Sequence, residues 1–263
     1  MFIFFVYISY SKWKGSSTLP HQTITGTVGG MLPSVQLKLV NWNEGEYRIT
    51  DKPNPRGEIL IGGGNVSMGY YNMPEKTAED FIYIDGVRYF ATGDIGEMLP
   101  KGYLKIIDRK KDLVKLSGGE YVSLNKVESL VKLMPLVDNV CMIANPIKSY
   151  CVALICPNLN FMKEIFKQEL PEVNIDMNDK NIDKLLANIC IILNKNEKLV
   201  DKLTNQIKEH CKNQNLFTFE IPDKVKFVKE IWLPDTGLVT DSLKIKRKEI
   251  EKFYAKDINI LYE

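Results

Sequence analysis

The chain has 263 residues, of which 44% are apolar and 26% are charged, the composition of an ordinary globular protein. Its formal net charge of +2 gives no overall attraction to nucleic acid. Two histidines, and five cysteines without CxxC spacing, argue against a zinc site and favour buried free thiols in a reducing compartment.

The apolar start MFIFFVYISY (1–10) is too short to span a bilayer and lacks the basic start and cleavage site of a signal peptide. It fits a buried strand whose upstream neighbours are missing, or a mis-specified start of the chain. We expect a cytoplasmic protein, and peripheral association with a membrane, such as the face of the endoplasmic reticulum, stays open.

Residues 25–110 predict short strands joined by turns. MPEKTAEDF (73–81) carries Pro74 in its first turn and predicts a short helix. The strands are expected at VQLKLV (35–40), RGEILIGGG (56–64), RYFATGDIGEMLP (88–100) and KGYLKIID (101–108). The last two predict a hairpin that turns at Pro100-Lys101-Gly102.

Beyond residue 110 the pattern changes to alternating helices and strands. Ser123 is a good N-cap for LNKVESLVKLM, whose apolar positions 124, 127, 130, 131 and 134 share one face. Further strands are expected at DNVCMIA (138–144), YCVALICP (150–157) and KVKFV (224–228), and helices near 176–194, near 196–213 and from about 246. The sequence therefore predicts a mixed α/β protein, with a β-rich domain over residues 1–110, an α/β domain over residues 111–263 and a joint near 108–112.

Three stretches contain candidate functional residues. In TGD (92–94), Asp94 follows a Thr-Gly turn at a strand start and could chelate a ribose diol, although such turns are usually structural. Arg109, at the end of the next strand, fits a surface ion pair with Asp108. Across the hairpin, however, Asp94 and Arg109 could point into the same cleft.

The second stretch is the tail LPDTGLVTDSLKIKRKEIEKFY (233–254). Basic residues at a helix start oppose the macrodipole, so local stability does not explain them. Lys246 and Lys248 fit a solvated helix face. Lys244, at a loop tip between Leu243 and Ile245, fits that interpretation less well.

The third stretch, IIDRKKDLVKLSGGEYVSLNKVE (106–128), combines a basic run with two adjacent glycines. A nucleic-acid face, a phosphate cradle and a mechanical joint are all candidates for it.

Four segments together resemble the C-terminal portion of AMP-forming long-chain acyl-CoA synthetases, a branch of the adenylate-forming enzymes. They are RGEILIGGGNVSMGYYNMPEKTAEDF, YFATGDIGEMLPKGYLKIIDRKKDLVKLSGGEYVSLNKVE, FEIPDKVKFV and GLVTDSLKIKRKEI. The resemblance runs from about Thr25 to about Lys252 and covers less than half of the usual family length. It implies the β-rich distal subdomain of the adenylating domain followed by a small C-terminal lid domain.

The resemblance also implies roles for individual residues in the first half-reaction. Asp94 matches the aspartate that holds the ribose hydroxyls of ATP, and Arg109 the arginine that supports the ribose and phosphate end. Lys244 matches the catalytic lysine of the lid. A lysine suits this step because a fatty carboxylate and the α-phosphate, both anions, must approach each other.

For the second half-reaction, Lys111 matches the hinge residue around which the lid rotates. Gly118 and Gly119 match the turn that lies along the pantetheine arm of CoA, and we assign Glu120 to the same CoA-binding turn. Glycine lets the backbone approach a ligand closely. The basic stretch is then a joint with ligand contacts, and no nucleic-acid partner is expected.

The implied function is ATP-dependent activation of a long-chain fatty acid to acyl-CoA through an acyl-adenylate, with ATP, CoA and Mg²⁺ as cofactors. The family's phosphate-binding loop and Tyr-Gly-x-Thr-Glu motif are absent from this sequence, so the Mg²⁺ ligands are expected upstream.

A fragment of a longer enzyme and a degenerate copy are both possible, and the abrupt start favours a fragment. The alternative function is a non-catalytic binding or regulatory protein whose basic tail contacts anionic lipid. Acyl chain length and oligomeric state stay open.

Overall fold

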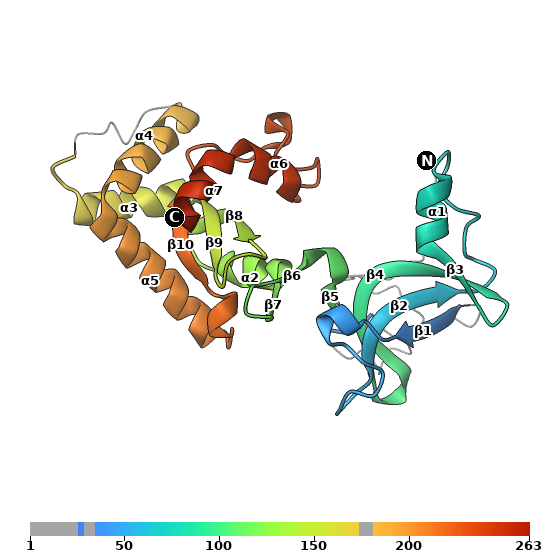
Figure 1. Ribbon diagram of the computed structural model, residues 1–263. Coiled ribbons are helices and arrows are strands. Elements are labelled where there is room, and N and C mark those ends of the chain that lie inside the picture. Colours follow the sequence, from blue (N-terminus) through green and yellow to red (C-terminus); the bar gives the residue numbers. More distant parts are fainter. Residues whose placement is uncertain (1–25, 29–34, 174–180) are drawn as a thin grey trace, which may run out of the picture. The chain divides into compact units, whose positions relative to one another are not determined.

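The computed structural model describes residues 26–28, 35–173 and 181–263 (Figure 1). The chain divides into two compact units, the first ending at Leu113 and the second beginning at Val114. The apolar segment 1–10 and the first residues of the helix expected from 176 lie outside the described residues.

The first unit is built on an antiparallel sheet. Its strands are β1 (Gln36–Val40), β2 (Arg56–Gly62), β3 (Phe81–Ile84), β4 (Val87–Leu99) and β5 (Tyr103–Arg109). The order is β1-β2-β4-β3, and β5 pairs with the second half of β4 beyond the end of β3. Ile59, Ile61 and Leu104 form its small core.

The elements expected from sequence in this unit are confirmed. The turn between β4 and β5 is a 3₁₀ turn at Pro100–Gly102, where the hairpin was predicted. The short helix α1 (Pro74–Asp80) has its proline in the first turn, where the missing N–H breaks no hydrogen bond.

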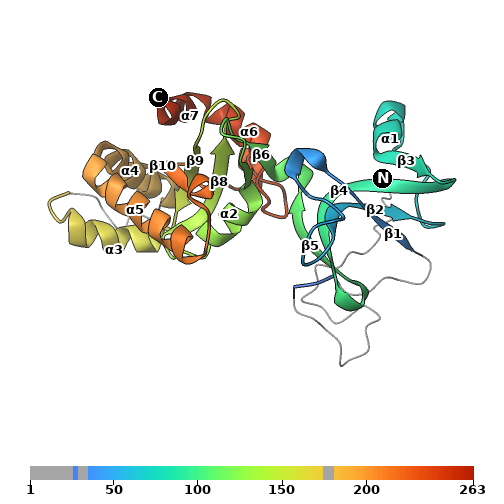
Figure 2. The same ribbon diagram turned by 60° about the horizontal axis from the view of Figure 1, so that its bottom comes forward.

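The second unit has a three-stranded sheet in the order β10-β9-β8 (Figure 2). β8 (Val137–Ala144) and β9 (Cys151–Pro157) are antiparallel, whereas β10 (Pro222–Phe227) runs parallel to β9. A parallel pair needs a long crossover, and α3 (Leu159–Glu169), α4 (Ile182–Lys195) and α5 (Glu197–Asn213) lie within it. Every residue of β9 is buried, as expected of a central strand covered on both faces.

The remaining elements flank this sheet. α2 (Leu124–Val131), α6 (Arg247–Phe253) and α7 (Ala255–Tyr262) pack against its strands. A two-stranded ribbon of β6 (Leu113–Lys115) and β7 (Tyr121–Ser123) precedes α2. No helix among the described residues is both long and apolar enough to cross a membrane.

Two expectations for this unit need correction. No helix was predicted at 159–169, yet α3 forms there, because Asn158 caps it by accepting a hydrogen bond from the Phe161 N–H at 3.0 Å. The helix that follows Ser123 ends at Val131, before Met134, and Ser123 holds the N-cap position without a side-chain capping bond.

All five cysteines are buried and free, as predicted. Burial raises the pKa of the Cys141 thiol to about 12 and that of Cys211 to about 11, so both stay protonated near neutral pH. We expect a thiol-reactive dye to label none of the five thiols in the native protein and all five in denaturant. Rapid labelling of a native thiol would contradict this packing.

Candidate functional site

A bulge in β4 holds the first candidate residue. Thr92, Gly93 and Asp94 lie opposite the single residue Ile59 of β2. The prediction that they lie at a strand start is wrong, because all three lie inside β4. Gly93 has a φ of +70°, which glycine adopts without strain. The Thr92 hydroxyl donates to the Ile59 carbonyl at 2.8 Å and accepts from the Asp94 N–H at 3.0 Å. A bulge of this kind changes the direction in which a side chain points, here that of Asp94.

Asp94 and Arg109 are direct partners across the β4–β5 hairpin. Arg109 Nε donates to Asp94 Oδ1 at 2.8 Å, with side chains 59% and 21% exposed respectively. A pair this exposed adds little stability. Asp108, the partner that a surface ion pair would have used, instead accepts the Arg109 backbone N–H at 2.8 Å. The two residues meet, and their role toward ATP stays a prediction.

The two lysines that follow lie in different environments. Lys110 Nζ lies 2.8 Å from Glu58 Oε2 and 5.6 Å from the centre of the Trp42 ring, so it is bound within the first unit. Lys111 is exposed in a single 3₁₀ turn, Lys110–Asp112, next to the boundary between the units.

The glycine pair forms the tight turn between β6 and β7. The Leu116 N–H donates to the Glu120 carbonyl at 2.8 Å, and the Gly119 N–H donates to the Leu116 carbonyl at 3.0 Å. Gly119 needs to be glycine because its φ is +96°. A Cβ at Gly118 would lie 2.3 Å from Glu120 Oε2, the end of an exposed side chain that can move aside, so packing does not require glycine there. The turn is exposed, and the Glu120 carboxylate lies beside Gly118.

Lys244 lies on a short hairpin between β10 and α6. Val239 and Ile245 pair in an antiparallel bridge at its base. The Thr240 N–H donates to the Lys244 carbonyl at 2.8 Å, and the Lys246 N–H donates to the Leu238 carbonyl at 2.8 Å. The Lys244 side chain is exposed.

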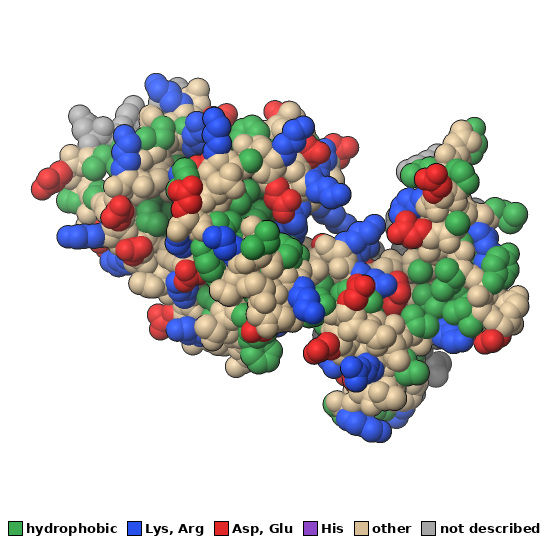
Figure 3. All heavy atoms as spheres, viewed as in Figure 1, with side chains coloured by type: hydrophobic (Ala, Val, Ile, Leu, Met, Phe, Trp, Pro, Cys, Tyr) green, Lys and Arg blue, Asp and Glu red, His purple; other side chains and the backbone are tan. Residues whose placement is uncertain are grey.

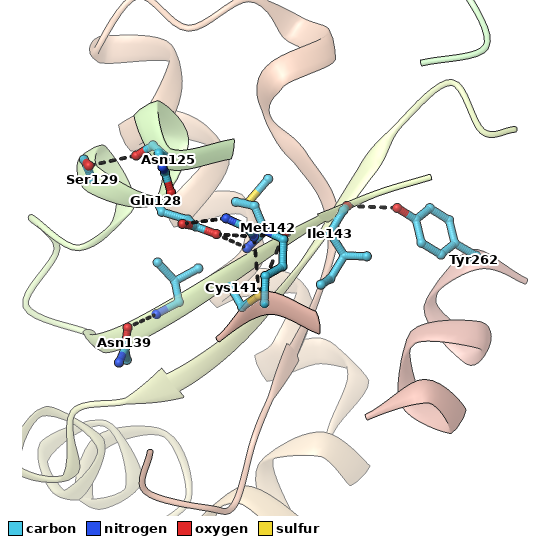
Figure 4. A network of polar contacts seen from close by, with 10 residues as sticks. Asn125, Glu128, Ser129, Asn139, Cys141, Met142, Ile143 and Tyr262 are labelled. Carbon is cyan, nitrogen blue, oxygen red and sulfur yellow. Dashed lines mark hydrogen bonds and ion pairs between the residues drawn. The ribbon is translucent and has the colours of Figure 1, made fainter. Parts of the chain in front are cut away.

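An ion pair that was not predicted from sequence anchors the end of this hairpin. Arg247 Nη1 donates to Glu128 Oε1 at 2.7 Å and Nη2 donates to Oε2 at 3.1 Å. Arg247 Nη1 also donates to the Met142 carbonyl at 2.6 Å. Glu128 in turn accepts the Met142 N–H at 2.7 Å, reaching from α2 to β8 (Figure 4).

Burial dominates the electrostatics of this pair. Glu128 is 5% exposed, and desolvation raises its pKa although the Arg247 guanidinium opposes the change. The geometry supplies the bidentate contact and backbone hydrogen bonds that a buried charge needs. Because Arg247 follows Lys244 by three residues, the pair ties the end of the hairpin to α2 and β8.

Basic and acidic side chains are mixed over the face of the second unit that is visible in Figure 3. On that side the described residues form no continuous basic stripe of the kind that tracks a nucleic-acid backbone.

No protein-family model matches the chain. Long chain acyl-CoA synthetase 8 of Arabidopsis thaliana is 42% identical over 255 residues, which are 97% of this chain. The chain belongs to the AMP-forming long-chain acyl-CoA synthetase family. It corresponds to the C-terminal part of these synthetases and spans 32% of the Arabidopsis protein.

Other comparisons agree with this assignment. Long-chain-fatty-acid–CoA ligase 4 of Saccharomyces cerevisiae is 33% identical over 90% of this chain and 32% of its own length. The AMP-bound adenylation domain of the carboxylic acid reductase from Segniliparus rugosus matches with a TM-score of 0.70 and 26% identity. That match covers 88% of this chain and 32% of the bacterial chain, which confirms the predicted fold class.

Within the synthetase fold, the predicted site residues other than Lys111 form three groups. Asp94 and Arg109 lie together in the first unit. The turn Gly118–Glu120 and the Lys244 hairpin belong to the second unit. A charged side chain at a helix start that opposes the macrodipole was the available signal for Arg247. No signal in the sequence marked Glu128 as its partner.

Proposed function

We propose that this synthetase chain carries the lid and the ribose-binding hairpin of an enzyme that activates a long-chain fatty acid to acyl-CoA. The 42% identity to an acyl-CoA synthetase along 97% of the chain is the observation that carries the proposal. Fatty acid, ATP and CoA are the proposed substrates.

In the first half-reaction a carboxylate oxygen of the fatty acid attacks the α-phosphorus of ATP and pyrophosphate departs. Lys244 lies between the two anions and offsets their repulsion, a contribution of about 3 kcal/mol by comparison with a single oxyanion donor. An exposed side chain on a hydrogen-bonded hairpin that is anchored through Arg247 suits this task, because the ammonium group can enter a site while the backbone is held in place.

Asp94 accepts hydrogen bonds from the two ribose hydroxyls. The hydrogen bond from Arg109 Nε to Asp94 Oδ1 limits the rotation of the carboxylate and leaves Asp94 Oδ2 for the ligand. The bulge that contains Gly93 sets the direction of the Asp94 side chain.

In the second half-reaction the CoA sulfur attacks the acyl carbonyl, the thioester bond forms and AMP leaves. The Gly118–Glu120 turn then runs beside the pantetheine arm, since neither glycine carries a side chain that would keep a ligand from the backbone. Lys111 is the proposed hinge between the two arrangements.

Magnesium would accompany the phosphates of ATP and share the charge on the departing pyrophosphate. Among the described residues, no cluster of three or more His, Cys, Asp or Glu side chains could hold a metal ion. The proposal therefore assigns no residue of the described chain to the metal.

The first test is fatty-acid-dependent ATP–pyrophosphate exchange. The 263-residue protein is compared with a longer form that includes any upstream reading frame. Exchange by either form supports the proposal. Absence of exchange from both would favour a second candidate, a non-catalytic binding protein.

A hinge role for Lys111 predicts that Lys111→Pro selectively impairs the second half-reaction. Proline fixes φ and disfavours the helical conformation of Lys110 before it, so the backbone loses the torsions that rotation needs. We expect thioester formation from supplied acyl-adenylate to fall about tenfold or more while pyrophosphate exchange is retained. The exposed Lys111→Ala variant is the matched control, and an unimpaired thioester step in Lys111→Pro would contradict the hinge.

A further inference from the structure

Leu243, the residue before Lys244, has an unusual backbone conformation. Its φ is +58°, in the left-handed region. Among the described residues, the other non-glycine positions with positive φ are Glu46, Asn72, Asp85, Lys101 and Asn215, all polar or charged. A branched apolar side chain in this region is strained by its Cβ.

The hydrogen bonds of the hairpin explain why this conformation is required. The Leu243 N–H donates to the Thr240 carbonyl at 2.8 Å and closes a turn, and the next bond joins the Thr240 N–H to the Lys244 carbonyl at 2.8 Å. A turn of this form places its last residue in the left-handed region, where glycine is preferred. The Thr240 hydroxyl reinforces the tip by accepting the Lys244 N–H at 3.1 Å.

Burial does not explain the leucine either. Leu243 is 58% exposed and follows the polar residues Thr240, Asp241 and Ser242. Both the backbone and the exposure therefore favour glycine or asparagine at this position. Neither the backbone conformation nor the exposure of this position favours leucine, so we infer that function requires the side chain. Strained backbone conformations of this kind are concentrated at functional sites.

We propose that Leu243 is a positioning residue for Lys244, an inference that rests on the proposed function. Its apolar side chain accompanies the lysine into the reaction site and excludes water from around the ammonium and the α-phosphate oxygens. Removing water strengthens the attraction between these charges in the adenylation step. The thioester step does not use the lysine and gains nothing from this leucine.

Three substitutions separate the side chain from the backbone strain. Leu243→Asn and Leu243→Gly relieve the strain and remove the apolar group, whereas Leu243→Met keeps an apolar group of similar size. We expect Leu243→Asn to raise the midpoint of thermal unfolding by about 3 °C and Leu243→Gly by less, because glycine makes the unfolded chain more flexible. We expect both to slow pyrophosphate exchange about tenfold, equal to about 1.4 kcal/mol, and to leave the thioester step unchanged. Leu243→Met keeps exchange within about twofold.

Lys101→Asn is the matched control, because Lys101 is exposed and has a φ of +66° at the tip of the β4–β5 hairpin. It should stabilise the protein without altering exchange. Full exchange by Leu243→Asn and Leu243→Gly would overturn the inference and leave the proposed function intact. Absence of exchange from every form of the wild-type protein would overturn both.

Discussion

Lys244→Ala is expected to slow acyl-adenylate formation by about 10²–10³-fold, the effect of losing one preorganised charge at an oxyanion. The side chain is exposed, so the substitution should leave the fold and its stability unchanged. Thioester formation from supplied acyl-adenylate should continue, because that step brings together a thiol and an acyl carbonyl and needs no cation at the α-phosphate. The two half-reactions are measured as pyrophosphate exchange and as release of CoA thioester.

Lys248→Ala is the matched control, since Lys248 carries the same charge and is exposed on α6 four residues further along. It should alter neither half-reaction. Equal losses of both half-reactions in Lys244→Ala would contradict the role we assign, as would comparable losses in Lys248→Ala.

Glu128→Ala is expected to lower the free energy of unfolding of the second unit by about 3–5 kcal/mol. The substitution leaves the Arg247 guanidinium, 18% exposed, without its carboxylate partner and leaves the Met142 N–H without its acceptor. Urea denaturation followed by circular dichroism measures the loss. Because Arg247 also ends the Lys244 hairpin, pyrophosphate exchange should fall in the same variant even under conditions where it remains folded.

The double replacement Glu128→Leu with Arg247→Met should recover much of the lost stability, since two apolar groups leave no buried charge unpaired. The exposed pair Lys167–Glu164, with side chains 62% and 63% exposed, provides the control. Glu164→Ala should change the free energy of unfolding by less than about 0.5 kcal/mol. A similarly small change in Glu128→Ala would show that the buried pair does not anchor the hairpin.

The elements that local sequence specifies were predicted well. The β4–β5 hairpin followed from two strand-like runs joined by the turn residues Pro100–Gly102, and α1 followed from Pro74 at its first turn. In each case the signal lies within a few residues of the structure that it specifies. The helix α3 shows the limit of this approach, because its Asn158 cap was present in the sequence and was not recognised.

The candidate site was predictable only where family motifs named its residues. The sequence suggested that Asp94 and Arg109 approach each other, and the register of the hairpin brings them to 2.8 Å. It did not suggest that Asp94 is aimed by a bulge, since the irregularity arises from how β2 pairs with β4. The basic run 244–248 likewise does not reveal that Arg247 is the residue that pairs with a buried carboxylate.

The sequence by itself determined the family, most of the strands and helices, and the residue types available for chemistry, because each of these is written in short segments and their spacing. Only the tertiary structure decided that, within the same basic run, Arg247 pairs with Glu128, 119 residues away, while the Lys244 side chain is exposed. It also decided that Leu243 adopts a left-handed backbone. Burial and hydrogen bonding between distant segments set both outcomes, and these depend on the packed chain as a whole.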